Sequence, residues 1–138
     1  MPKAAAASHT PPKPSAREIS AAGLRAFFNI ARDWGLTTEE QMVLLGSPGR
    51  STFFKWKAAP ESIELKRDTL ERLSYLLGIY KALQILLPDA AAADAWVKKP
   101  NTAPGFGGKS ALERMLGGNV ADLVAVRQYL DAQRGGWG

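Results

Sequence analysis

One short stretch of the chain has the residue types that could cradle a phosphate: APGFGGKS, residues 103–110. In a P-loop, glycines let backbone N–H groups turn inward onto the phosphates, a lysine reaches the β- and γ-phosphates, and a serine binds magnesium. Lys109 and Ser110 would take the last two roles here. Ala103, however, stands where the strict motif has its first glycine.

The residues around this stretch do not favour a nucleotide site. A P-loop follows a buried strand within a parallel sheet, whereas residues 88–97 (PDAAAADAWV) form an alanine-rich run that favours a helix. The chain also lacks a hydrophobic run that ends in the aspartate needed for the magnesium site. A nucleotide enzyme is therefore kept only as an alternative, and the glycines need another explanation.

The 138 residues contain few of the residue types that other kinds of catalysis need. There is no cysteine, which excludes thiol nucleophiles, disulfides and cysteine–zinc sites and fits a reducing cytoplasm. The only histidine, His9, lies in a leader rich in proline and alanine, so a histidine-based metal site or catalytic triad is not expected. We expect a cytoplasmic protein that is not an enzyme and has no metal or cofactor.

The charge and hydropathy patterns bear on the partners of the chain. Its net charge of +5 is concentrated in residues 1–60, where eight basic residues stand against four acidic ones. This excess predicts either a polyanion partner or a solvated basic surface. The most apolar run, residues 73–88, is shorter than the ~20 residues of a membrane span and contains Lys81, so no membrane partner is expected.

The first half of the chain reads as an arm followed by helices. Residues 1–16 contain four prolines and few large apolar groups, which is typical of a disordered arm. The spacing of Leu24, Phe27, Ala31 and Trp34 then predicts an amphipathic helix. A short second helix is expected to be capped by Thr37 or Thr38, with Glu40 completing a capping box, and to end at Gly46.

The next stretch, SPGRSTFFKWK, predicts the second helix of a helix-turn-helix. Ser47 would be its N-cap and Pro48 its first residue. At about 100° per residue, Phe53, Phe54 and Trp56 share one broad face and are expected in the core. The opposite face would contact DNA or be merely solvated. The DNA candidates are Arg50, Ser51, Thr52, Lys55 and Lys57, with Lys3 and Lys13 of the arm on phosphates.

The second half also reads as helical. A long helix is expected over about residues 65–87, apolar nearly all round beyond Gly78, so it would form the centre of a second domain or a dimer interface. A further helix is expected between Pro88 and Pro100. Ser110 and Asn119 would cap the last two helices, of which the final one extends to Gln133. The predicted divisions are an arm (1–16), a helix-turn-helix domain (17–62) and a helical dimerisation domain (63–138).

The pairing of these two parts resembles the Xre/MbcA/ParS-type antitoxins, whose toxins carry a RES domain. The N-terminal part is similar through GRSTFFKW, residues 49–56. The C-terminal part is similar through AW-VKKPN at 95–101, GFGGKSALERML at 105–116 and VRQYLDAQRGGW at 126–137. Ala111 departs from the family, which often has proline after the serine, but alanine is also a good helix former.

This resemblance implies an antitoxin that covers the active site of an NAD-consuming RES-domain toxin and represses its own operon by binding operator DNA. It also implies that residues 63–138 form a toxin-binding as well as a dimerisation domain, in which the glycine loop joins two helices. The expected protein is all-α and homodimeric through the long helix. The main alternative is a stand-alone helix-turn-helix regulator whose C-terminal half only dimerises.

Several residues of the C-terminal half are candidates for the toxin interface. Trp137 follows two glycines and has nothing local to pack against, and tryptophan and arginine often anchor interfaces. The alternative is that Trp137 folds back onto its own domain. The full set of toxin-binding candidates is Lys98, Lys99, Asn101, Phe106, Lys109, Arg134 and Trp137.

Overall fold

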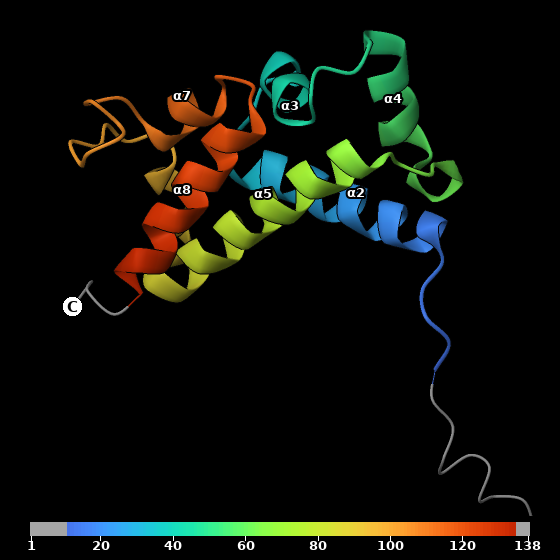
Figure 1. The fold of residues 1–138 in the computed structure, drawn as a ribbon, viewed down its shortest axis with the longest axis horizontal. Coiled ribbons are helices and arrows are strands. Elements are labelled where there is room, and N and C mark those ends of the chain that lie inside the picture. The colour runs from blue at the N-terminus through green and yellow to red at the C-terminus, as the bar shows by residue number, and fades with distance from the viewer. Residues whose placement is uncertain (1–10, 135–138) are drawn as a thin grey trace, which may run out of the picture.

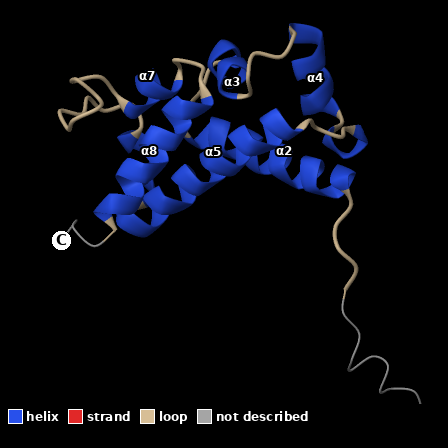
Figure 2. Cartoon of the chain, in the orientation of Figure 1, coloured by secondary structure: helices blue, strands red, loops and turns tan. Residues whose placement is uncertain are grey.

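The computed structural model describes residues 11–134 of the chain. Over these residues the regular elements are helices, as Figure 2 shows, apart from one isolated bridge between Pro100 and Ser110. The predicted all-α fold is confirmed. The elements are α2 (Ala16–Asp33), α3 (Thr38–Leu44), α4 (Arg50–Ala58), the 3-10 helix η1 (Pro60–Ser62), α5 (Arg67–Leu86), α6 (Ala90–Trp96), α7 (Ala111–Met115) and α8 (Val120–Gln133).

Local capping determines where most helices begin. The Thr37 hydroxyl accepts a hydrogen bond from the Glu40 N–H (3.1 Å), and the Glu40 carboxylate accepts one from the Thr37 N–H (2.8 Å). Ser110 and Glu113 form the same reciprocal pair at the start of α7. These boxes satisfy N–H groups that a helix start leaves without partners, so both predicted caps are confirmed.

Helix α5 is the central element of the fold (Figure 1). It packs against α2 and, more extensively, against α8. Leu76, Ile79 and Leu83 on α5 are fully buried between these neighbours. The predicted long helix over residues 65–87 is thus found as Arg67–Leu86, because Leu70, Leu73 and Leu77 continue its apolar spacing towards the N-terminus.

One continuous hydrophobic core extends through both halves of the chain. Leu24, Phe27 and Phe53 from the first half belong to the same buried cluster as Leu123 and Leu130 from α8. Burial of this much apolar surface is the main stabilising contribution to such a fold. The division into domains at residues 62 and 63 stays a prediction.

One apolar side chain of α5 beyond Gly78 lies at the surface of the chain, that of Ile85. Its side chain is 48% exposed, whereas Ile79 and Leu83 are fully buried. The reason is that α2 and α8 cover only part of the circumference of α5 and leave the side that carries Lys81 and Ile85 open. Within residues 11–134, no helix is both long and apolar enough to cross a bilayer.

Candidate functional sites

Helices α3 and α4 are joined by a tight turn of five residues, 45–49. Gly46 has a φ of 92° and Ser47 one of 58°, so both lie in the left-handed region. The prediction that Ser47 caps the second helix is wrong, because its left-handed backbone belongs to the turn. Helix α4 begins at Arg50, with Gly49 as N-cap and no side chain bonded to its first N–H groups. Pro48 consequently lies before the helix.

The first turn of α4 is therefore an open helix N-terminus. Its N–H groups point along the helix axis, and the partial positive charge of the helix dipole adds to them. Such an end binds phosphate oxygens readily. Ser51 and Thr52 lie in this turn and are exposed.

The aromatic residues of α4 divide between the core and the surface. Phe53 is fully buried and lies edge-on against Phe28, with ring centroids 5.9 Å apart. Trp56 is half-buried against the same core. Phe54 is 43% exposed, so the prediction that all three lie in the core is wrong for this residue. The core accepts the side of α4 that carries Phe53 and Trp56, and Phe54 is turned about 100° from Phe53 around the helix.

The five predicted DNA-binding residues of α4 are all exposed. Arg50 contacts Glu39 of α3, with 3.0 Å between Nη1 and Oε2, and its guanidinium lies 5.6 Å from the centroid of Phe54. Hydrogen bonding from Arg50 lowers the pKa of Glu39 below its ordinary value. Lys57 lies over the ring of Phe28 at 5.8 Å.

Sequence reasoning missed two neighbours of this surface. Glu39 is eleven positions from Arg50 and meets it only through the α3–α4 turn, so no local pattern signals the pair. Lys66 lines the same depression as Thr52 and Trp56, because the start of α5 lies beside α4. Two acidic residues, Glu64 and Asp68, line that depression as well, so the basic side chains of α4 have several acidic groups at their edge.

The glycine loop lies between α6 and α7, and no strand precedes it among the described residues. The Asn101 N–H donates to the Lys109 carbonyl (3.0 Å), and the Gly108 N–H donates to the Asn101 carbonyl (2.9 Å). Gly107 and Gly108 have φ values of 60° and 84°, and a Cβ on either would meet no atom within 4 Å. These glycines are thus required by backbone conformation, and their surroundings are open.

The serine and the lysine that a P-loop would use to bind magnesium and phosphate are placed differently in this structure. The Ser110 hydroxyl accepts from the Glu113 N–H (3.0 Å) and so caps α7. Lys109 is exposed. The loop serves as a connection between two helices, as the resemblance implies.

An aromatic cluster holds the loop against the domain. Phe106 is only 7% exposed, and its ring lies edge-on against Trp96 and Tyr129, with centroid distances of 6.4 and 5.0 Å. Trp96 and Tyr129 stack at 6.2 Å. Phe106 therefore positions the loop, and its role as a toxin contact stays a prediction.

Arg114 fixes the base of the same loop and was not singled out from the sequence. Its Nη1 donates to the Gly105 carbonyl (2.7 Å), and its Nε pairs with Asp122 Oδ1 (3.0 Å). Burial raises the pKa of Asp122, but hydrogen bonds from Arg114 and Asn119 lower it by more, so the net pKa is below the ordinary value. A depression of about 530 Å³ lies beside these groups, and Phe106 and Lys109 line it.

The structure separates the other predicted toxin-binding residues. Lys98 Nζ donates to the Gly35 carbonyl (3.1 Å) after the end of α2, and Lys99 is exposed nearby in the chain. Asn101 Oδ1 accepts from the Ala103 N–H (2.8 Å) and so shapes the loop. Arg134 lies apart from the loop, in a groove between α5 and α8. Trp137 lies outside the described residues, as does Lys3 of the arm.

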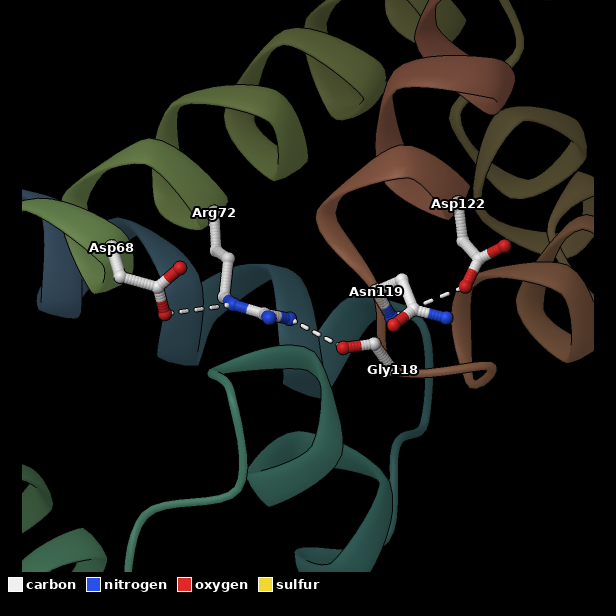
Figure 3. A network of polar contacts seen from close by, with 5 residues as sticks. All are labelled: Asp68, Arg72, Gly118, Asn119 and Asp122. Carbon is white, nitrogen blue, oxygen red and sulfur yellow. Dashed lines mark hydrogen bonds and ion pairs between the residues drawn. The ribbon is translucent and has the colours of Figure 1, made fainter.

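A network of polar contacts centred on Arg72 lies between the helix-turn-helix and the C-terminal helices (Figure 3). Arg72 on α5 pairs with Asp68 (Nε to Oδ2, 3.1 Å) and donates from Nη1 to the Gly118 carbonyl (2.9 Å). A Cβ on Gly46 would lie 3.0 Å from the Arg72 Nε, so the α3–α4 turn packs on the same side chain. Arg72 thus lies between the helix-turn-helix and the α7–α8 turn.

Together, the uncapped basic helix after a tight turn and the helical unit packed onto it define a DNA-binding helix-turn-helix protein with a second, helical module. Residues 14–78 match the Antitoxin Xre-like helix-turn-helix domain, and residues 82–136 match the Antitoxin Xre/MbcA/ParS C-terminal toxin-binding domain. The chain belongs to the Xre/MbcA/ParS-type antitoxins, and its partners are accordingly a toxin and DNA.

A relative from Sinorhizobium fredii (strain NBRC 101917 / NGR234), described as "Uncharacterized protein y4oB", is 56% identical over 115 residues. The match covers 83% of this chain and 86% of the relative. The similarity therefore extends over both modules.

Proposed function

We propose that this antitoxin neutralises a RES-domain, NAD-consuming toxin by covering its active site, and that it represses its own operon as a homodimer bound to operator DNA. In this proposal the chain acts in the cytoplasm, catalyses no reaction and needs no cofactor. The observation that carries the proposal is the position of its two modules. The uncapped basic helix α4 and the glycine loop lie at opposite ends of the molecule (Figure 1), so DNA and toxin do not compete for one surface.

On the DNA side, the support comes from the chemistry of α4. Arg50 has the fork geometry that binds guanine O6 and N7, and Ser51 and Thr52 beside an open helix N-terminus suit phosphate oxygens. Lys55 and Lys57 add positive charge along the same helix. A homodimer would place two such helices about 34 Å apart on the duplex, in successive major grooves.

The proposed homodimer needs a surface other than the buried face of α5. The apolar residues of that helix pack mainly against α2 and α8 of the same chain. Dimerisation therefore stays a proposal, supported by the symmetry with which helix-turn-helix proteins bind operators. Light scattering of the purified chain measures it directly.

The toxin half of the proposal is tested by co-expressing the chain with the product of the adjacent gene. Neutralisation predicts that the neighbour alone arrests growth and lowers cellular NAD, and that co-expression restores both and yields a complex on pull-down. A chain that binds its operator but neither binds nor neutralises the neighbour would be the stand-alone regulator instead.

The DNA half is tested by replacing Arg50 and Lys55 with alanine together. Operator affinity, measured by fluorescence anisotropy, should be abolished, while neutralisation of the toxin is retained. The matched control replaces Arg25 and Arg32, two exposed arginines of α2, with alanine and removes the same charge. Unchanged operator affinity in the α4 variant would remove α4 as the recognition helix.

A further inference from the structure

A groove of about 160 Å³ between α5 and α8 gathers three cationic side chains: Lys81, Arg127 and Arg134. Gly78 and Ala82 form its floor and Ile85 its apolar rim. We call this site the basic groove. Neither the glycine loop nor α4 contributes to it.

The floor of the basic groove is shaped for one guanidinium. A Cβ on Gly78 would lie 2.7 Å from Arg127 Cζ and still closer to its Nη1, so the guanidinium lies directly on the backbone of α5. A glycine inside a helix costs about 1 kcal/mol relative to alanine. The glycine at this position is explained by the room that it gives to Arg127.

A carboxylate on α8 also orients the Arg127 side chain. Its Nε lies 3.1 Å from both carboxylate oxygens of Asp131, one turn later on α8. Among the described residues, its Nη groups make no hydrogen bond, and Lys81 and Arg134 have no carboxylate within ion-pair distance. The groove therefore holds three positive side chains and only one carboxylate. The positive charges repel one another, and an anionic partner would reduce that repulsion.

We propose that the basic groove is a docking site for an acidic surface of the toxin, an inference that rests on the proposed function. Two observations favour a protein over DNA. Ile85 is 48% exposed at the rim, which suits an apolar contact with a protein. The C-terminal ends of α5 and α8, near which the groove lies, are also at the far end of the molecule from α4 and its proposed DNA contacts (Figure 1).

Continuity with the C-terminus points to the same partner. Arg134 lines the groove and directly precedes residues 135–138, which carry the predicted toxin contact Trp137. The groove is thus adjacent in the chain to the segment that is proposed to bind the toxin. Charges at such a position act mainly on the rate of association and on its dependence on salt.

The first test measures association of the full chain with the toxin encoded by the adjacent gene, by stopped flow over a range of NaCl concentrations. Lys81→Glu should slow association roughly tenfold at low salt and flatten its salt dependence. Arg67→Glu makes the same charge reversal at the other end of α5 and should leave the rate within about twofold of wild type.

The second variant separates binding from folding. Gly78→Ala should displace the Arg127 guanidinium from the groove and slow association with the toxin, while the melting temperature stays equal or rises because alanine favours the helix. A merely structural role for Gly78 would predict the opposite combination, a lower melting temperature with normal association.

Each other outcome overturns the inference in a recognisable way. If both groove variants associate as wild type does, the groove is not a toxin contact. If they lose operator affinity or dimerisation instead, its partner is DNA or a second copy of this chain. If the wild-type chain binds no neighbouring toxin at all, the proposed function fails and this inference fails with it.

Discussion

Arg72 Nη1 donates a hydrogen bond of 2.9 Å to the carbonyl oxygen of Gly118, 46 positions later in the chain. The Arg72 side chain is only 12% exposed, and its Nε is held by Asp68. The acceptor lies in the turn before α8, while the α3–α4 turn packs against the same arginine at Gly46. The Arg72 side chain therefore bonds to the backbone before α8 (Figure 3) and leaves little room for a side chain at Gly46 of the α3–α4 turn.

Arg72→Ala should lower the free energy of unfolding by about 1–3 kcal/mol, since it leaves a part-buried carbonyl without its donor. Urea denaturation followed by circular dichroism measures the change. Arg67→Ala, an exposed arginine five positions earlier, is the control and should change stability by less than about 0.5 kcal/mol. Equal midpoints for Arg72→Ala and wild type would show that this network of polar contacts contributes nothing.

Glu39→Gln should raise the affinity for operator DNA. In the free protein the Glu39 carboxylate holds Arg50 at 3.0 Å and adds a negative charge beside the proposed phosphate contacts. Both side chains are well exposed, so the pair is weak and its loss should improve binding by roughly two- to fivefold. Fluorescence anisotropy on the operator measures this effect, with Glu71→Gln on α5 as the control. Weaker binding by Glu39→Gln would mean that the pair positions Arg50 instead of competing for it.

The residues that the sequence predicted well are those whose partners lie three or four positions away. Thr37 with Glu40, and Ser110 with Glu113, form capping boxes that any reader of the sequence can identify. The apolar spacing of α5 likewise predicts its extent, because a helix repeats its faces every 3.6 residues.

The features that sequence reasoning missed depend on tertiary contacts. Ser47 is a favourable N-cap residue, yet the packing of the α3–α4 turn gives it a left-handed backbone. The contacts of Arg72 with Gly118 and of Arg50 with Glu39 join different elements. Phe54 is a further example. Helical periodicity gives the direction of its side chain around α4, but it does not say how much of the helix surface packs against the core.

Asp122→Asn should destabilise the protein in a pH-dependent way. The pKa of Asp122 is below its ordinary value of 3.8, so its charged form is favoured by folding. Its contribution is present above the unfolded pKa and is lost as the pH falls through the lower folded pKa. The difference in unfolding free energy between wild type and variant should therefore be largest near pH 7 and shrink towards pH 3. Urea titrations at pH 7, 5 and 3 measure it, and a constant difference would contradict the role of the charge.

Deleting Gly135–Gly138 should weaken neutralisation of the toxin without destabilising the fold. The last fully buried core residue is Leu130, and α8 ends at Gln133, so the deletion removes no described core contact. If Trp137 anchors the interface, its loss should reduce toxin affinity by roughly 30-fold, the effect of a hot spot of about 2 kcal/mol.

Affinity is measured by calorimetry and stability by thermal melting, with Trp137→Phe as a conservative control that should retain most of the binding. Full affinity in the truncated chain would place the toxin contacts on the glycine loop and the basic groove alone, whereas a lower melting temperature would mean that Trp137 packs on its own domain.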